Sequence, residues 1–226
     1  MSTPRAVARS LAAGQPGGTL AVPLALHVSA RIAERDAEDF VYDATQLANA
    51  LRDLIEAVSP DGVPVSDAEV LLAGCTSASQ LASSQQLKVA LEATRRLRAS
   101  FGDAIALAAV LPGPAAIASQ VEVAGPAAGD AVVTMGREFL AAGADVIIVH
   151  DHAELADVSL ATLANIARFH QALAVSSPTG RYGLSAAVPL GLHSPAHVPG
   201  VTVTSESLDR DTDIAVLRDW VSAVRG

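Results

Sequence analysis

The sequence predicts an α/β protein with a TIM-barrel-like parallel (β/α) fold, shortened or incomplete relative to the full (β/α)8 barrel. Short apolar runs alternate with amphipathic segments, an alternation that is typical of a parallel sheet covered by helices. The apolar runs are continuous, as expected for strands that are buried on both faces. The chain has 226 residues, whereas a complete barrel of this type has about 250.

The first half of the chain predicts three strands separated by two helices. Apolar residues recur at helical spacing in the first amphipathic segment, and the second ends at Gly102. The turn pair Asp61-Gly62 opens the second strand, whereas proline and glycine end the third. The expected strands cover residues 20–28, 61–67 and 104–114, and the expected helices cover 36–58 and 83–102.

The second half predicts one more regular strand between two helices, followed by a less regular region. Gly143 suits the end of the first of these helices, and Ser159 is a suitable N-cap for the second. Beyond residue 175 the periodicity weakens, so we expect six or seven strands rather than eight. The expected elements are a helix at 129–144, a strand at 145–152, a helix at 159–173, strands within 184–194 and 198–206, and a closing helix from residue 211.

The composition favours one domain spanning residues 1–226, with residues 1–18 partly disordered. Half of the residues are hydrophobic and only 3% are aromatic, so Ala, Val, Leu and Ile must build the core. The single lysine, Lys88, lies in a predicted helix, which argues against a Schiff-base lysine on a strand. A GC-rich genome would favour this Ala- and Arg-rich composition, and we associate it with specialised metabolism.

Charge and cysteine content limit the partners and the compartment. The net charge of −9 argues against binding to nucleic acid or an anionic membrane, because no basic surface would neutralise phosphates. No apolar run is long enough to cross a bilayer, and residues 1–18 contain no signal-peptide core. Cys75 is the only cysteine, so neither an intramolecular disulfide nor a Cys-based zinc knuckle is expected. We therefore expect a cytoplasmic protein that acts on a small-molecule substrate.

Several motifs occur in an informative order. An opening helix is followed by the proline-bearing strand "LAVPLALHV", by a second helix and by "DGVPVSD". The segments "AIALAAVLPGP", "GREFLAAGADVIIVHDHAE" and "VPLGLH" come next, in that order. Over residues 6–170 this order resembles the uroporphyrinogen decarboxylase superfamily. The resemblance implies a (β/α)8 barrel, in a superfamily that includes decarboxylases and corrinoid-linked methyltransferases.

The resemblance implies roles for two aspartates. Asp67 matches the catalytic aspartate of the decarboxylases, and Asp151 falls where the family also places an aspartate. The Arg-rich loop that holds substrate carboxylates in the decarboxylases is not reproduced, although Arg31 and Arg35 lie nearby. The family's tyrosine after the third-strand Gly-Pro is missing, and one cysteine cannot supply the methyltransferases' zinc site of one His and two Cys. The chain therefore resembles this superfamily but lacks its standard catalytic motifs.

Polar residues concentrate where the predicted strands end, which is where parallel α/β folds bind ligands. Five of the six histidines lie at or just beyond such an end. Arg181 is also available to anchor a substrate carboxylate. We predict acid–base catalysis by Asp67, His150 and Asp151, and substrate binding by His27, Arg31, His152 and His193.

A metal site is an alternative use of the same histidines. His150 and His152 are two residues apart on a predicted strand and would face the same side. Imidazole is a common zinc ligand, so a metal-dependent hydrolase or lyase could use His27, His150, His152 and His193 to bind a divalent metal. The leading hypothesis needs no cofactor. The structural alternative is that these polar residues only form a solvated rim.

The leading functional hypothesis is a small-molecule lyase, decarboxylase-like, that uses acid–base residues at the strand ends. A third hypothesis is a non-catalytic binding or accessory subunit. A shortened barrel leaves open sheet edges, which a partner or a second copy must cover. For the same reason we expect a homo-oligomer, a homodimer being the simplest form.

Overall fold

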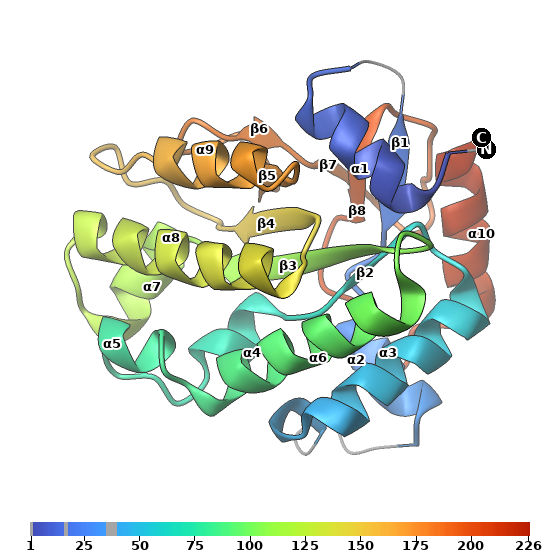
Figure 1. Cartoon of the computed structure of the whole chain (residues 1–226), viewed down its shortest axis with the longest axis horizontal. Coiled ribbons are helices and arrows are strands. Elements are labelled where there is room, and N and C mark those ends of the chain that lie inside the picture. Colours follow the sequence, from blue (N-terminus) through green and yellow to red (C-terminus); the bar gives the residue numbers. More distant parts are fainter. Residues whose placement is uncertain (1, 16–17, 35–39) are drawn as a thin grey trace.

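The computed structural model describes residues 2–15, 18–34 and 40–226, which form a wall of parallel strands with helices packed outside it (Figure 1). The strands belong to two sheets, and every pair is parallel. The five-stranded sheet runs in order β2 (Gly62–Pro64), β3 (Ala106–Pro112), β4 (Val146–His150), β5 (Leu173–Ser177) and β6 (Ser185–Ala186). The three-stranded sheet runs in order β1 (Thr19–Val22), β8 (Gly200–Thr204) and β7 (Val188–Leu190).

One continuous segment joins the two sheets on one side. Only Ala187 separates β6 from β7, and its N–H donates to the Ser176 carbonyl oxygen at 2.8 Å. Residues 185–190 therefore pair with β5 through their first part and with β8 through their second. Counted as one strand, this segment gives a barrel of seven strands, one fewer than the full fold.

Asp61 joins the two sheets on the other side, between β1 and β2. Its N–H donates to the Ala21 carbonyl oxygen at 3.2 Å, and its carboxylate Oδ2 accepts from the Ala21 N–H at 2.9 Å. Its own carbonyl oxygen accepts from the Ala106 N–H of β3 at 2.9 Å. Arg225 of α10 donates twice to Oδ1, at 2.9 and 2.7 Å. One residue thus connects β1 with β2, β3 and the last helix.

Helices lie around this wall (Figure 1), and within the described residues no helix falls between β5 and β6 or between β7 and β8 along the chain. The side chain of Asp43 caps the start of α3, where it accepts from the Thr45 and Gln46 N–H groups. At the end of α8, Gly143 adopts the left-handed backbone conformation that commonly ends a helix. The helices are α1 (Pro4–Ala12), α2 (Leu26–Ile32), η1 (Phe40–Tyr42), α3 (Ala44–Val58), α4 (Ala68–Leu72), α5 (Ala78–Leu81), α6 (Gln85–Phe101), α7 (Pro114–Val121), α8 (Gly125–Ala142), α9 (Ala161–Phe169) and α10 (Ile214–Arg225).

The barrel is shortened because two connections carry no helix. Residues 178–184 link β5 to β6, and residues 191–199 link β7 to β8; both links lie wholly within the described residues and form loops. The sequence prediction of a shortened TIM-barrel-like fold is confirmed, and the two loops account for the missing length.

Two apolar clusters fill the fold, one inside the wall and one between the wall and the helices. Successive residues of a strand alternate between them: Val146 and Ile148 face the interior, whereas Ile147 and Val149 face the helices. The interior cluster consists of small and branched side chains, namely Ala8, Leu20, Val22, Leu24, Ala68, Ala106, Ala108, Val110, Val146, Ile148, Val175, Ala187, Val201 and Val203.

Helix α1 covers the end of the barrel at which the strands begin, since it packs against β1, β3 and β5. Arg5 of α1 donates to Oδ1 of the buried Asp145 at 2.9 Å, and Asp145 Oδ2 accepts from the Leu107 N–H at 2.9 Å and from Arg98. A buried carboxylate with this many donors stabilises the end of the barrel that lies opposite the strand ends. The sequence predicts partial disorder for residues 1–18, and the structure shows that residues 4–12 of this segment form the helix α1.

The sequence predictions err where an apolar run fits either kind of element. The predicted strand 20–28 ends at Val22, and its last three residues begin α2 instead, because a short buried helix and a strand look alike by periodicity. Strand β5 was not predicted, since its first residue was assigned to the preceding helix. The N-cap of α9 is Leu160 rather than Ser159. The predicted helix 36–58 is observed from Ala44 onward, and residues 36–39 lie outside the described part of the chain.

The remaining boundaries agree to within a few residues. The closing helix has Asp213 as its N-cap, two residues after the predicted start. Helix α8 begins at Gly125, four residues before the predicted 129–144. Short helices α4, α5 and α7 were not predicted. No helix within the described residues combines the length and the apolar character needed to span a bilayer.

Replacing Asp61 tests how the two sheets are joined. Asp61→Ala leaves the buried Ala21 N–H without an acceptor, so we expect the free energy of unfolding to fall by about 1–3 kcal/mol. Asp61→Asn keeps an acceptor oxygen and should lose less. Urea denaturation of both variants measures the difference, and equal losses would show that the ion pair with Arg225 matters instead.

Candidate functional site

A cavity of about 400 Å³ opens at the carboxyl ends of the strands. This is the end at which parallel barrels bind ligands. Its walls come from β3 and β4, from the starts of α2 and α4, and from the loop between β8 and α10. The residues that line it are His27, Asp67, Ala68, Glu69, Val110, His150, His152, Glu206, Ser207, Leu208 and Asp209.

The structure brings four of the seven predicted site residues together. His27, Asp67, His150 and His152 all line this cavity. His27 reaches it from the first turn of α2 and not from the end of β1 as predicted. His193 lies exposed in the loop 191–199 and does not line the cavity, and neither do Arg31 and Asp151.

His150 and His152 form the central pair of the site. Their Nε2 atoms are 3.3 Å apart, and the two rings meet edge to face. His150 continues the interior face of β4 after Val146 and Ile148, and burial is the largest reason why its pKa is lowered, followed by the neighbouring His152. His150 is therefore neutral at neutral pH, and the ring nitrogen that carries no hydrogen can accept a proton.

Hydrogen bonds hold the carboxylate of Asp67 in place. It is 5% exposed and is the N-cap of α4, where its Oδ1 accepts from the Glu69 N–H at 2.9 Å. Its Oδ2 accepts from the Ser207 hydroxyl at 2.9 Å. The carboxylate thus joins the end of β2 to the loop after β8, on the wall of the cavity.

Asp151 is buried outside the cavity, so its position does not support the predicted contact with substrate. It is 3% exposed, and its Oδ2 accepts from the Ala115 N–H of α7 at 2.8 Å and from the Tyr182 hydroxyl at 2.7 Å. Burial and this hydrogen bond raise the pKa of Tyr182. A Cβ added at Gly113 would lie 2.2 Å from Asp151 Oδ2, so this close approach requires glycine. Asp151 connects the loops that follow β3, β4 and β5.

Two buried polar atoms at the ends of β4 and β5 have no hydrogen-bond partner, and only one of them belongs to a residue that lines the cavity. One is His150 Nδ1, and the other is the hydroxyl of Ser177, which is 1% exposed. Ser177 is the register partner of His150 in the β4–β5 pair. It shares the face of Val175, which belongs to the interior cluster. Both residues are therefore neighbours on adjacent strands and share the inner face of the barrel.

The other candidates from the sequence have structural partners elsewhere. Arg31 donates to the Thr212 carbonyl oxygen, and Arg35 lies outside the described residues. Arg181 Nε donates to Thr179 Oγ1 at 3.0 Å, and Arg181 does not line the cavity. Burial raises the pKa of the Cys75 thiol, which disfavours the thiolate that a nucleophile requires.

The predicted four-histidine metal site is not assembled, because His193 is absent from the cavity. Across the described residues, no group of three or more His, Cys, Asp or Glu side chains is arranged to hold a metal ion. The zinc site that the family resemblance implies for methyltransferases requires thiolates, and Cys75 does not line the cavity.

Sequence reasoning missed the carboxylates at the mouth. Glu69 follows Asp67 on α4, and Glu206 and Asp209 follow β8. The rule that parallel strands bind ligands at their carboxyl ends could have identified the loop 205–213. Ser177 was missed because β5 was missed, whereas Tyr182 carries no signal in the sequence.

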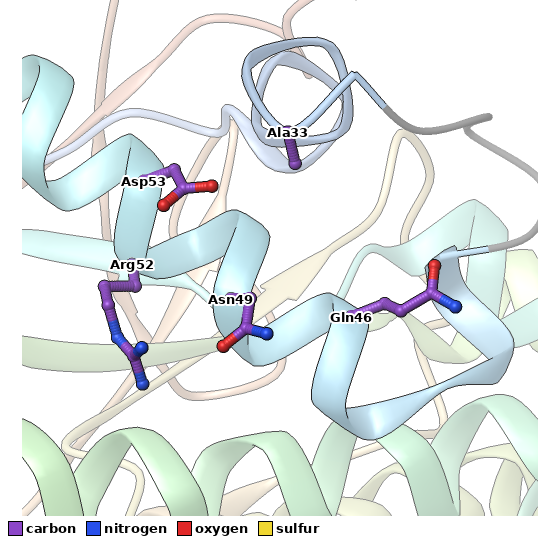
Figure 2. A pocket seen from close by; sticks show the side chains of 5 residues that line it. All are labelled: Ala33, Gln46, Asn49, Arg52 and Asp53. Atoms are coloured by element: carbon purple, nitrogen blue, oxygen red, sulfur yellow. The ribbon is translucent and has the colours of Figure 1, made fainter.

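A second hollow, of about 350 Å³, lies between α2 and α3. Figure 2 shows Gln46, Asn49, Arg52 and Asp53 along α3, with Ala33 of α2 facing them. These four polar side chains point in different directions and do not converge on a common point (Figure 2). The hollow therefore lacks the convergent polar groups that a binding site needs.

Comparison with known proteins supports the fold. A solved methyltransferase from Methanosarcina mazei is similar to this chain with a TM-score of 0.60 and 15% sequence identity, over 78% of this chain and 69% of that chain. No protein-family model matches the chain, and no curated protein matches it. At this identity the likeness shows a shared TIM-barrel-like architecture and nothing about chemistry.

The lowered pKa of His150 predicts a pH dependence of stability. The unfolded chain takes up the imidazole proton near pH 6.5, whereas the folded chain resists it until lower pH. Stability should therefore fall as the pH drops below about 6.5, by at most about 1.4 kcal/mol per pH unit from this residue. His150→Gln should reduce that loss in urea denaturation at successive pH values.

The exposed His193 supplies the control for this measurement. His193→Gln should leave the pH dependence as in the wild type, because the side chain lies outside the cavity. Identical profiles for His150→Gln and the wild type would contradict the assignment.

Proposed function

We propose that the protein is a small-molecule enzyme that performs proton-transfer chemistry, of lyase or isomerase type, at the mouth of the barrel. The observation that carries this proposal is the His150–His152 pair, whose Nε2 atoms are 3.3 Å apart in a cavity that Asp67 and His27 also line. Decarboxylation is the member of this reaction class that the family resemblance implies.

The histidine pair is suited to accept a proton from a bound substrate. His150 is neutral because it is buried, whereas His152 is exposed to solvent. A proton that His150 accepts can pass to His152 across the 3.3 Å contact and from there to water. The negative charges of Asp67 and Asp151 favour the imidazolium that forms transiently on His150.

The two aspartates receive different roles. Asp67 faces the cavity, where its carboxylate holds the start of α4 and the loop after β8 together and stabilises positive charge in the cavity. Asp151 acts as a positioning residue, since its bonds to Ala115 and Tyr182 hold the loops around His150. His27 supplies a third imidazole for binding the substrate.

The fold likeness supports the proposal of an enzyme that acts on small molecules. The neighbour in the comparison is described as a methyltransferase, and barrels of this kind place their catalytic residues where this cavity lies. Membership of the uroporphyrinogen decarboxylase superfamily is part of the proposal, and it rests on the order of motifs together with this fold. A homo-oligomer and a cytoplasmic location stay predictions.

Exchange of hydrogen with solvent tests the proposed chemistry. The purified protein is incubated in deuterated water with a small-molecule extract of cells, and mass spectrometry follows deuterium uptake and carbon dioxide release. We expect at least one compound to be converted, and His150→Gln to slow that conversion by about 10²–10⁴-fold because the general base is lost.

His193→Gln is the matched control, because it removes a histidine that does not line the cavity. It should retain the wild-type rate. An activity that survives His150→Gln, or an extract that stays unchanged by the wild-type protein, would contradict the proposal.

A metal-dependent hydrolase or lyase is the second candidate. The 3.3 Å separation of the two Nε2 atoms favours it, since two nitrogens bound to one tetrahedral zinc at about 2.0–2.1 Å lie at a comparable distance. Metal analysis of the purified protein tests it. Near-stoichiometric zinc that His152→Gln abolishes would support this candidate, whereas less than about one-tenth of an equivalent, with no effect of a chelator on stability, would exclude it.

A further inference from the structure

We propose that the cavity at the strand ends binds a small organic cation, a compound that carries one or more protonated amino groups. The proposal deepens the proposed function by naming the substrate class of the same site. It rests on that function only where the ligand is called a substrate. Binding itself can be tested separately.

The charges on the cavity wall all have one sign. Of the eleven described residues that line it, four are carboxylates and none is lysine or arginine. The three lining histidines do not reverse this balance, because His150 is held neutral by burial. A cleft lined by one sign of charge concentrates ligands of the opposite sign. The four carboxylates are Asp67, Glu69, Glu206 and Asp209.

These carboxylates are held on two sides of the opening. Asp67 and Glu69 begin α4, whereas Glu206 and Asp209 lie in the loop after β8. The Ser207 hydroxyl donates to Asp67 Oδ2 at 2.9 Å, and the Leu208 N–H donates to the Leu24 carbonyl oxygen at 2.8 Å. These bonds fix the loop against the end of the barrel, so the acidic side chains face a common space.

Unpaired polar atoms on the inner face of the barrel, one of them on the lining residue His150, are an independent sign of a missing ligand. The Ser177 hydroxyl is 1% exposed and has no partner, and it lies on the inner face beside His150, whose Nδ1 is also unpaired. Buried polar atoms are nearly always hydrogen-bonded, so an unpaired pair of them on adjacent strands calls for a third group.

The shape of the site favours an organic cation over a metal ion. Glu69, Glu206 and Asp209 are exposed around the opening, and the described residues contain no group of three or more close ligands for a metal. A volume of about 400 Å³ is in the range of small-molecule sites. Dispersed carboxylates around such a volume suit a ligand with separated positive groups.

The same charges disfavour a polycarboxylate substrate. The family resemblance implies a substrate whose carboxylates are held by arginines, whereas no arginine within residues 2–15, 18–34 and 40–226 lines this cavity. The four carboxylates would repel such a ligand from two sides of the opening. The chain therefore differs from the decarboxylases in the charge that its substrate must carry.

Calorimetric titration of the full chain tests the proposal with matched probes. We expect 1,4-diaminobutane, a monoamine or a triamine to bind at low ionic strength. The uncharged 1,4-butanediol should bind at least about ten-fold more weakly, succinate should not bind, and added salt should weaken the binding of amines. The same titration is carried out with zinc ions and with magnesium ions.

Charge-neutralising variants identify the site. Glu206→Gln and Asp209→Asn should each weaken amine binding by about two- to five-fold, as expected for exposed charge pairs. Asp130→Asn is the control, because this exposed carboxylate on α8 lies outside the cavity. It should bind amines as the wild type does.

Each outcome decides the proposal. Selective amine binding that the two cavity variants weaken supports it. Absence of binding by all three amines, equal binding of the diol, tighter binding of succinate or of a metal ion, or equal effects of the cavity and control variants would overturn it. Amine binding without any turnover would contradict the proposed function alone, whereas turnover of an anionic compound would contradict only the substrate class.

Discussion

The structure depends on how a parallel sheet with too few helices closes on itself. Residues 185–190 pair with β5 and then with β8, and they complete one side of the wall as a single strand. On the other side, Asp61 takes the place of a hydrogen-bonded ladder between β1 and β2, because it bonds to both the N–H and the carbonyl oxygen of Ala21. Buried backbone groups must be paired, so these two junctions allow a barrel to close with seven strands and two loops in place of helices.

Closure determines the geometry of the cavity. Because β4 and β5 are in register, His150 and Ser177 are neighbours on the inner face, directly above the apolar interior of Val146, Ile148 and Val175. The apolar layer below excludes water and keeps His150 neutral. The loop after β8 reaches this point because β8 lies next to β1, which brings Ser207 to Asp67. Residues 140 positions apart thereby form one wall.

Asp67 and Asp151 occupy similar positions in the sequence but have different surroundings in the structure. Both follow a strand and both are buried. Asp67 faces the cavity and caps a short helix, whereas Asp151 turns toward Ala115 and Tyr182 behind it. Within the described residues, the opening near Asp67 is lined by four carboxylates and by no lysine or arginine.

The sequence by itself determined the parallel α/β class, the shortened length and four residues of the cavity, because apolar periodicity and strand-end polarity are local patterns. It could not separate the end of β1 from α2, nor β5 from the end of α9, since short buried helices and strands share the same composition. Only the tertiary structure decided that His193 and Asp151 lie outside the cavity while Glu206 and Asp209 line it. Those placements depend on strand register and on which loops cross the opening, and both arise from contacts between residues far apart in the chain.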